Sequence, residues 1–186
     1  DFDVHHGNGT QDTFYNDPRV LYISTHQYPH YPGTGGIDET GGGQGAGTTL
    51  NIPLPAGCGD SEYLKVFREI IIPAAGHFEP QLVLVSAGYD AHWADELAMM
   101  EMTVAGFTRM VRVIKEMADK LCSGRLVFSL EGGYNLVGLS SSVRATLGVL
   151  LGSTTVEDPL GESPHRVEAQ DITSLVERIK EIHKLP

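Results

Sequence analysis

Residues 81–87 have the sequence QLVLVSA, a nearly unbroken apolar run that lies between a proline and a glycine. A short apolar run with such boundaries is typical of a strand in the middle of a parallel sheet. The run RLVFSL at 125–130 predicts a second buried strand. The segments 19–25 (RVLYIST) and 48–54 (TTLNIPL) are rich in β-branched and aromatic residues and predict two more. We expect strand 81–87 to be central and buried on both faces.

Helices are predicted between these strands and after the last of them. Apolar residues recur with helical spacing in 60–78, which contains Pro73 and should be kinked or shortened there. Further helices are predicted over 103–121 and 139–151, and a last one, capped by its first residue, over 171–183. Strands that alternate with helices indicate an α/β domain with a mostly parallel sheet flanked by helices.

The length of 186 residues suits one domain, 1–186, in which residues 153–186 form a linker and a C-terminal helix. The formal net charge of −11 makes the chain a poor direct binder of nucleic acid, although it suits a cationic partner such as a lysine-rich tail or a polyamine. Two cysteines are too few for a disulfide framework and indicate a reducing compartment, which we take to be the cytoplasm. No apolar run reaches the roughly 18 residues of a membrane span.

Three segments at or beside predicted strand ends carry polar side chains. In parallel sheets, ligands bind beyond the carboxyl ends of the strands. Asp90 follows strand 81–87, and Tyr134 follows strand 125–130. The chain itself opens with DFDVHHGNGT, in which Asp1, Asp3 and His5 would share one face of an extended segment. Alone, this opening is equally consistent with a strand end whose charges are solvated.

Taken together, these side chains fit a catalytic metal site. Asp3, His5 and Asp90 supply three ligands and leave one position open, as in catalytic zinc sites. Zinc lowers the pKa of bound water to about 7 and polarises a carbonyl group. The phenol of Tyr134 can donate a hydrogen bond to an oxyanion. Each side chain also has an ordinary interpretation: Asp90 as a turn or cap residue, and Tyr134 as a packed aromatic.

The motifs of the chain resemble those of histone deacetylases, in the arginase–deacetylase superfamily, and cover the C-terminal half to two-thirds of such a protein. They are Asp1-Phe2-Asp3-Val4-His5-His6-Gly7-Asn8-Gly9-Thr10, Tyr31-Pro32-Gly33-Thr34-Gly35, Asn51-Ile52-Pro53-Leu54, Ser86-Ala87-Gly88-Tyr89-Asp90 and Leu130-Glu131-Gly132-Gly133-Tyr134-Asn135. Asn8 and the Glu-Gly-Gly-Tyr form are closer to class II enzymes and their bacterial relatives, which include acetylpolyamine amidohydrolases. The resemblance implies an α/β fold of the arginase–deacetylase type.

The resemblance also implies roles for single residues. Asp3, His5 and Asp90 would hold zinc, Tyr134 would stabilise the tetrahedral intermediate, and Asp1 would lie behind the ligands, paired with a histidine. The residues expected along the acyl-lysine tunnel are Tyr31, Leu97, Gly132 and Gly133. Those expected around a monovalent cation beside the zinc are Asp1, Asp3, His5, Ser24 and Thr25. Those expected around a second such ion, usually potassium, are Phe14, Asp17 and Val20.

The remaining histidines receive less specific expectations. We expect His6 to be a buried, hydrogen-bonded structural residue. We place His92 and Trp93 at the mouth of the pocket. Surface or packing positions are expected for His26, His30, His77, His165 and His183.

One feature of the family is absent from these residues. The deacetylases carry a tandem His-His upstream of the Asp-x-Asp-x-His motif, whereas this chain starts at Asp1 and without Met. We therefore expect a fragment that is incomplete at its N-terminus. Loss of a general base lowers catalysis by about 10² to 10⁴. Apolar surface left uncovered should also favour association, for example as a homo-oligomer.

Three functions remain open at this point. The first is a zinc-dependent amidohydrolase that deacetylates acetyl-lysine or an acetylpolyamine. The second is a metal-binding remnant or scaffold without turnover. The third is a dimanganese ureohydrolase, suggested by Asp90-Ala91-His92, although Asp95 lies one residue too far along for that motif and the Gly-Gly-Tyr loop speaks against it.

Overall fold

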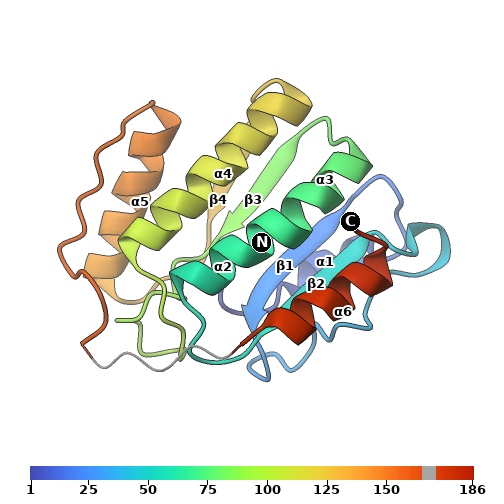
Figure 1. Cartoon of the computed structure of the whole chain (residues 1–186), viewed down its shortest axis with the longest axis horizontal. Helices are drawn as coiled ribbons and strands as arrows, with labels where there is room; N and C mark the ends of the chain where they lie inside the picture. The colour runs from blue at the N-terminus through green and yellow to red at the C-terminus, as the bar shows by residue number, and fades with distance from the viewer. Residues whose placement is uncertain (165–170) are drawn as a thin grey trace.

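The computed structural model describes residues 1–164 and 171–186, in which the strands form two parallel pairs. Strand β1 (Tyr22–Gln27) pairs with β2 (Thr49–Leu54), and β3 (Val83–Ala87) pairs with β4 (Leu126–Leu130). The registers place Tyr22 opposite Thr49 and Val83 opposite Leu126. The predicted parallel α/β arrangement is confirmed (Figure 1).

The first four residues join the two pairs into one layer. The amide of Phe2 donates to the carbonyl of Ser86 at the end of β3 (3.0 Å). On the other side, the amides of Thr25 and Gln27 in β1 donate to the carbonyls of Asp1 and Val4 (3.1 and 2.9 Å). The spatial order is therefore β2, β1, residues 1–4, β3, β4. The opening segment thus occupies the position of a central strand.

Most of the helices cover one face of this layer, whereas helix α1 (Asn8–Phe14) lies behind β1 on the other face (Figure 1). The predicted helix 60–78 is present as a continuous rod in which a π-helical turn separates two α-helical parts. Proline has no N–H group for the helical hydrogen bond, and its ring clashes with the carbonyl four residues before it. The wider π-helical turn ahead of Pro73 accommodates this ring. The helices are α1 (Asn8–Phe14), α2 (Asp60–Val66), the π turn (Phe67–Ile71), α3 (Ile72–Phe78), α4 (Val104–Cys122), α5 (Leu136–Leu150) and α6 (Thr173–His183), with a 3₁₀ turn at Gly43–Gly45.

The core lies between the helices and the layer of strands. Phe2 contacts the rings of Tyr89 and Phe107, with centroid distances of 5.6 and 6.0 Å. Phe2, Val4 and Phe107 are buried. Thr103 accepts a hydrogen bond from the amide of Gly106 (3.0 Å) and so caps α4.

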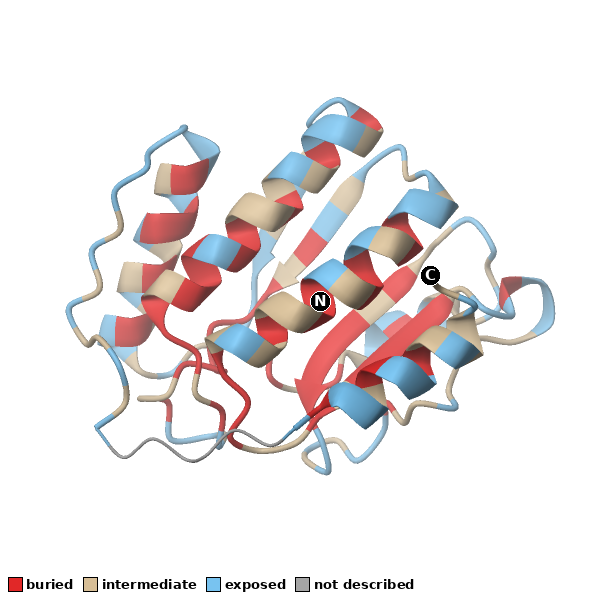
Figure 2. Ribbon diagram, in the orientation of Figure 1, coloured by how far each residue is buried: buried red, intermediate tan, exposed pale blue. Residues whose placement is uncertain are grey.

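The predictions that strand 81–87 is buried on both faces and that strand 125–130 is a buried strand were wrong. Val85 is 5% exposed, but Leu84 and Val127, which lie opposite each other in the register, are 68% and 51% exposed (Figure 2). Alternate side chains of a strand point to opposite faces, and only one face of β3 and β4 is covered by helices. An apolar run indicates which residues prefer burial, but it does not supply the layer that buries them.

Several boundaries also differ from prediction. Strand β1 begins at Tyr22 rather than 19 and runs on through Gln27, because a turn in which Val20 donates to Asp17 occupies its expected start. Helix α5 begins at Leu136, earlier than 139, because Asn135 caps it by accepting from the amide of Gly138 (2.9 Å).

The predicted C-terminal helix is present, but it begins at Thr173 and not at Asp171. Asp171 accepts a hydrogen bond from the amide of Thr173 (2.9 Å), and α6 ends at His183 as expected. The prediction for His165 falls on residues 165–170, outside the described part. No described helix is both long and apolar enough to cross a membrane.

Candidate metal centre

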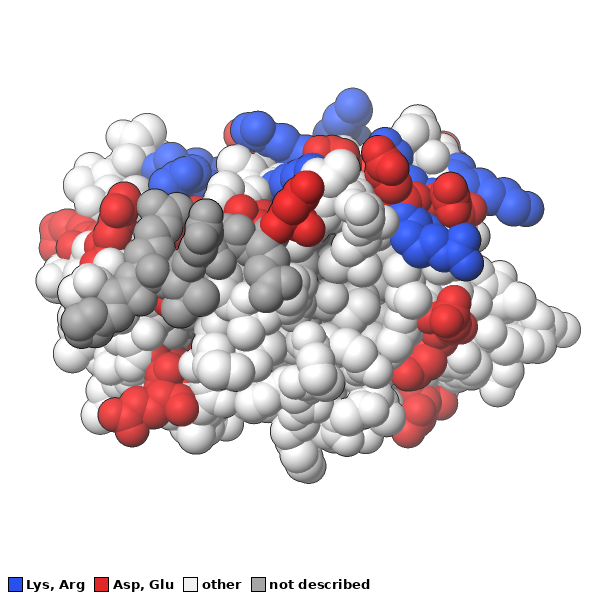
Figure 3. All heavy atoms as spheres, turned by 60° about the horizontal axis from the view of Figure 1, so that its bottom comes forward, with Lys and Arg blue, Asp and Glu red and all other residues white. Residues whose placement is uncertain are grey.

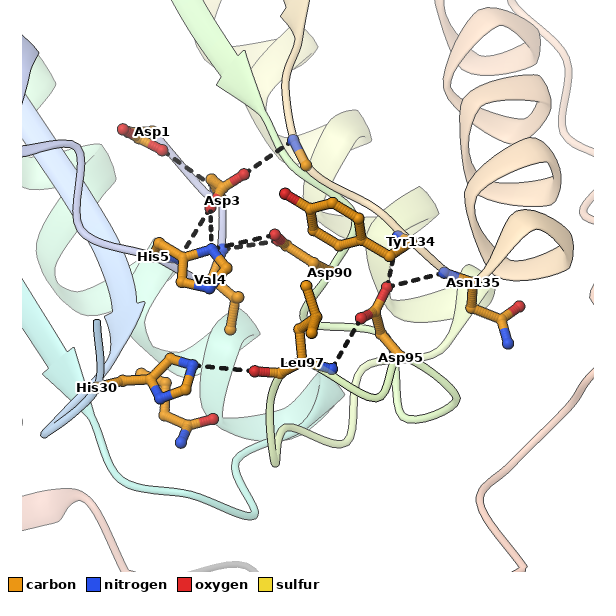
Figure 4. A network of polar contacts seen from close by, with 12 residues as sticks. Asp1, Asp3, Val4, His5, His30, Asp90, Asp95, Leu97, Tyr134 and Asn135 are labelled. Carbon is orange, nitrogen blue, oxygen red and sulfur yellow. Dashed lines mark hydrogen bonds and ion pairs between the residues drawn. The ribbon is translucent and has the colours of Figure 1, made fainter. Parts of the chain in front are cut away.

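Asp3, His5 and Asp90 meet at the end of β3, as predicted (Figure 4). One ligand atom from each lies within 4.8 Å of the others. The Nδ1 atom of His5 lies 3.1 Å from Oδ1 of Asp3 and 3.3 Å from Oδ2 of Asp90. Asp3 and Asp90 are buried, and His5 is partly exposed. The cluster therefore has one open side, at the imidazole.

The charges of the cluster are strongly coupled. Hydrogen bonds to Asp3 and Asp90 raise the pKa of His5 to about 10, against the opposing effect of burial. Burial favours the neutral form of Asp3, but hydrogen bonds from His5 and from the amide of Gly132 outweigh it and hold the pKa of Asp3 below its ordinary value. Two carboxylates around one ring nitrogen attract a positive charge, which a divalent cation can supply in place of the proton.

The hydrogen bonds of Asp90 support a cation at this place. Its Oδ1 accepts from the amide of Val4 (2.9 Å), whereas the buried Oδ2 has only the His5 Nδ1 atom at 3.3 Å and makes no well-formed hydrogen bond among the described residues. A buried carboxylate oxygen without such a partner is costly unless an ion takes that role. One nitrogen and two oxygen ligands with an open side suit a catalytic zinc ion, so these residues fit the metal.

Two glycines make room for the ligands. A Cβ atom at Gly132 would collide with the carboxylates of both Asp90 and Asp3, and one at Gly88 would collide with Asp3. Gly133 has φ of 131°, a backbone conformation that favours glycine, so the chain turns sharply just before Tyr134. Gly132 is needed for a different reason, namely the close approach of two side chains.

Tyr134 is aimed at the cluster. Its ring extends from the loop after β4, and its hydroxyl points toward Asp3 and Asp90 (Figure 4). Desolvation, and then the negative charges of Asp90 and Asp3, raise the pKa of Tyr134. The hydroxyl therefore keeps its proton at neutral pH and can donate a hydrogen bond.

Two loops flank the open side of His5. The ring of His30 stacks on that of His5 (5.3 Å, 19°), and Tyr31 meets it edge-on at 6.1 Å. The Nε2 atom of His30 lies 3.0 Å from the carbonyl oxygen of Leu97 and joins the two loops. The residues predicted to line a tunnel, Tyr31 and Leu97, are 75% and 48% exposed. Their role as a tunnel wall stays a prediction.

Asp1 lies behind the ligands, where its Oδ1 accepts from the amide of Asp3 (3.1 Å). Pairing of Asp1 with a histidine is not seen among the described residues. The predicted monovalent-cation positions carry internal hydrogen bonds instead. Ser24 Oγ lies 2.9 Å from His26 Nδ1, and the amide and hydroxyl of Thr25 both donate to the carbonyl of Asp1.

In the second predicted cation site, the carbonyls of Phe14 and Asp17 accept from the amides of Asp17 and Val20 (2.9 and 3.3 Å). Because a carbonyl oxygen has two lone pairs, these bonds still leave acceptor capacity. Both cation sites remain predictions.

The other histidines divide clearly. His6 is buried and hydrogen-bonded to Thr34 and Gln11 (2.8 and 3.0 Å), as predicted. The prediction that His92 stands at the pocket mouth was wrong. It is 1% exposed, and its ring packs against Gly138 of α5. Trp93 next to it donates to the carbonyl of Gly161.

Sequence reasoning missed Asp95 as a member of this site. It is buried beneath the Tyr134 loop and accepts hydrogen bonds from the amides of Tyr134 and Asn135 (2.7 and 3.0 Å). The one available signal was an acidic residue five positions after Asp90 in the same strand-end loop.

Comparison with known proteins assigns a family to this geometry. Residues 1–150 match the histone deacetylase domain. The chain is 48% identical over 187 residues to histone deacetylase 14, chloroplastic, of Arabidopsis thaliana, covering 100% of this chain and 44% of that protein. It is 50% identical to histone deacetylase 10, chloroplastic, of Oryza sativa subsp. japonica over 191 residues, or 100% of this chain and 42% of that one.

Solved structures agree with the fold. The structure of the HDA15 HD domain has a TM-score of 0.82 and 39% identity, covering 98% of this chain and 48% of that one. The structure of the histone deacetylase Clr3 has a TM-score of 0.84 and 37% identity, covering 98% of this chain and 30% of that one. The chain thus spans less than half the length of these relatives and adopts the arginase–deacetylase fold.

Proposed function

Because the chain belongs to the histone deacetylase family, we propose that it is the metal-binding part of a zinc-dependent deacetylase. The reaction is hydrolysis of the amide of an acetylated amine, either acetyl-lysine or an acetylpolyamine. One observation carries the proposal: the ligand atoms of Asp3, His5 and Asp90 gather within 4.8 Å, and the hydroxyl of Tyr134 points toward them.

Each residue has a task in this proposal. Asp3, His5 and Asp90 hold the metal, and the buried Oδ2 of Asp90, whose near polar neighbour is His5 Nδ1 at 3.3 Å, is one of the ligand atoms. Zinc held there supplies a Lewis acid that polarises an amide carbonyl and lowers the pKa of water. Tyr134, protonated at neutral pH, donates a hydrogen bond to the oxyanion that develops on the substrate. Tyr31 and Leu97 flank the approach of the acylated amine.

The charge of the surface suits a cationic amine. In the view of Figure 3, Lys and Arg side chains of the described residues lie among Asp and Glu along the upper edge, whereas the lower half shows Asp and Glu without Lys or Arg. The carboxyl ends of the strands lie toward this side of the molecule. A negative field raises the local concentration of cations such as a lysine-rich tail or a polyamine. The cytoplasmic location of the chain stays a prediction, because two of its relatives are named chloroplastic.

A second candidate is a metal-binding chain without turnover. The tandem histidine of the family is not among these 186 residues. Among the described residues, the imidazole of His30 stacks on that of His5. Its Nε2 atom is hydrogen-bonded to the carbonyl oxygen of Leu97, so this nitrogen is not free to act as a base. Release of acetate from an acetyl-lysine peptide by the zinc-loaded chain would exclude this candidate.

The dimanganese ureohydrolase is not supported. That chemistry needs a second metal ligated around Asp90, yet His92 is turned into α5. Within the described residues, the groups able to hold a metal form a single cluster. A metal analysis that found two manganese ions per chain would restore this candidate.

The metal assignment is tested by Asp90→Asn, which keeps the size of the side chain but removes its charge. Wild type should bind one zinc ion per chain in equilibrium dialysis, and the variant should bind at least about 100-fold more weakly. Asp12→Asn, at an exposed carboxylate, is the matched control and should bind like wild type. Undiminished zinc binding by the Asp90 variant would refute the assignment.

A further inference from the structure

Asp95 ties the Tyr134 loop to the loop that follows Asp90. Its carboxylate is 4% exposed and accepts three backbone hydrogen bonds. Oδ2 accepts from the amides of Tyr134 (2.7 Å) and Asn135 (3.0 Å), and Oδ1 accepts from the amide of Leu97 (3.1 Å; Figure 4). One side chain therefore restrains both the segment that bears the phenol and the segment predicted to line the substrate path.

The position of the phenol depends on this restraint. The side chain of Tyr134 is 59% exposed, so packing holds it weakly. Its hydroxyl makes no hydrogen bond among the described residues. Gly133 before it has φ of 131°, a region in which glycine gives the backbone unusual freedom. Two successive amides bonded to one oxygen remove that freedom and fix the direction in which the side chain leaves the main chain.

Asn135 adds a second connection at the same place. Its Nδ2 donates to the carbonyl of Ala94 (3.0 Å), while its Oδ1 caps α5 through the amide of Gly138. The Asp95 carboxylate thus lies at the N-terminus of α5, where a negative charge is favoured. The Tyr134 loop is therefore held between the start of α5 and the loop that follows Asp90, and Asp95 contacts both.

We propose that Asp95 is a positioning residue of the deacetylation reaction, an inference that rests on the function proposed above. It holds the main chain of Tyr134 so that the hydroxyl stays directed at the cluster of Asp3, His5 and Asp90. Through the amide of Leu97 it also sets the distance between that hydroxyl and the neighbouring loop, whose carbonyl is bonded to His30.

A carboxylate is required for this arrangement. Hydrogen bonds from backbone amides to an ionised acceptor are stronger than those to a neutral one. Asparagine has one acceptor oxygen, so its NH₂ group would face either the amide of Leu97 or those of Tyr134 and Asn135. The change Asp95→Asn therefore removes at least one bond and places donors against each other with little change in size.

Amide hydrogen exchange tests the restraint without any need for activity. In the zinc-loaded chain, Asp95→Asn should speed exchange at the amides of Tyr134 and Asn135 by about tenfold or more. The amide of Gly106, bonded to Thr103, should be unchanged. Glu96→Gln, at an exposed neighbouring carboxylate, is the control. Unchanged exchange at both amides would overturn the inference. If Asp95→Asn does not fold, Asp95→Glu, which moves the charge by one methylene, takes its place.

A double-mutant cycle tests the link to catalysis. With acetyl-lysine peptide, Tyr134→Phe should lower kcat about 100-fold, and Asp95→Asn should lower it between about 10- and 100-fold, with KM and zinc content little changed. Added to Tyr134→Phe, Asp95→Asn should cost less than about twofold more, because the hydroxyl it positions is absent.

If the Tyr134→Phe and Asp95→Asn effects on kcat multiplied in the double variant, the positioning role of Asp95 would be overturned, while the proposed function would be unaffected. Absence of hydrolysis by zinc-loaded wild type would instead favour the second candidate, a metal-binding chain without turnover. In that case the exchange measurement alone decides whether Asp95 holds the Tyr134 loop.

Discussion

Acid should destabilise the chain through His26, and the structure gives the size of the effect. His26 is fully buried in β1; Ser24 Oγ lies 2.9 Å from its Nδ1, and its Nε2 donates to the carbonyl of Gly35 (3.0 Å). These partners suit the neutral ring. Burial, and then the neighbouring imidazole of His6, lower the pKa of His26 from 6.5 to about 4.

The sign follows from the direction of this pKa change. A histidine that must charge in the folded core binds protons more readily when unfolded, so its contribution is complete above pH 6.5 and is lost as the pH falls toward 4. The full difference between these pKa values is worth about 3 kcal/mol, at about 1.36 kcal/mol per pH unit. Between pH 7 and pH 5, the expected loss from His26 alone is about 2 kcal/mol.

Urea unfolding of the metal-free protein at pH 7 and pH 5 measures this loss. His26→Gln keeps a donor for Gly35 but cannot titrate, so its stability should fall by about 2 kcal/mol less than that of wild type over this range. His77→Gln, at an exposed histidine, is the control and should follow wild type. If wild type and His26→Gln lost the same unfolding free energy between pH 7 and pH 5, burial of a neutral His26 would not be the cause of the acid sensitivity.

Three further predictions concern space and burial. Gly132→Ala should weaken zinc binding about 10- to 100-fold in equilibrium dialysis, since its Cβ collides with the ligand carboxylates, whereas Gly9→Ala, which meets nothing within 4 Å, should not. Burial raises the pKa of Cys58 to about 12, so iodoacetamide at pH 8 should label it only in urea; rapid labelling of the native protein would contradict this. Phe107→Ala should cost about 3–5 kcal/mol of unfolding free energy, because the ring is fully buried against Phe2, and a loss below about 1 kcal/mol would be inconsistent with that packing.

The strands and helices could be predicted where local pattern and tertiary environment agree. The apolar run of 81–87 and the helical pattern of 103–121 both correspond to elements of the structure. Exposure could not be predicted, because Leu84 and Val85 are chemically alike and differ only in which face of β3 the helices cover. Likewise, the buried His26 is hydrogen-bonded to the carbonyl of Gly35, a partner that sequence spacing does not reveal.

The candidate site shows the same division. Asp3, His5 and Asp90 could be identified because the strand-end rule and the family motifs point to the same residues, and the structure brings them together. Asp95 was considered only as a badly spaced metal ligand, and its actual role was missed because its partners are backbone amides. Amides carry no residue identity, so no motif marks a residue that acts through them.

The segment of residues 1–5 carries two of the three proposed ligands and also joins β1 to β3. Cobalt, which absorbs visible light when bound by nitrogen and oxygen ligands, could therefore serve as a probe of refolding. Its absorbance should develop only when the start of the chain and the end of β3 have come together. A colour change would then time the assembly of the sheet directly, without any label attached to the protein.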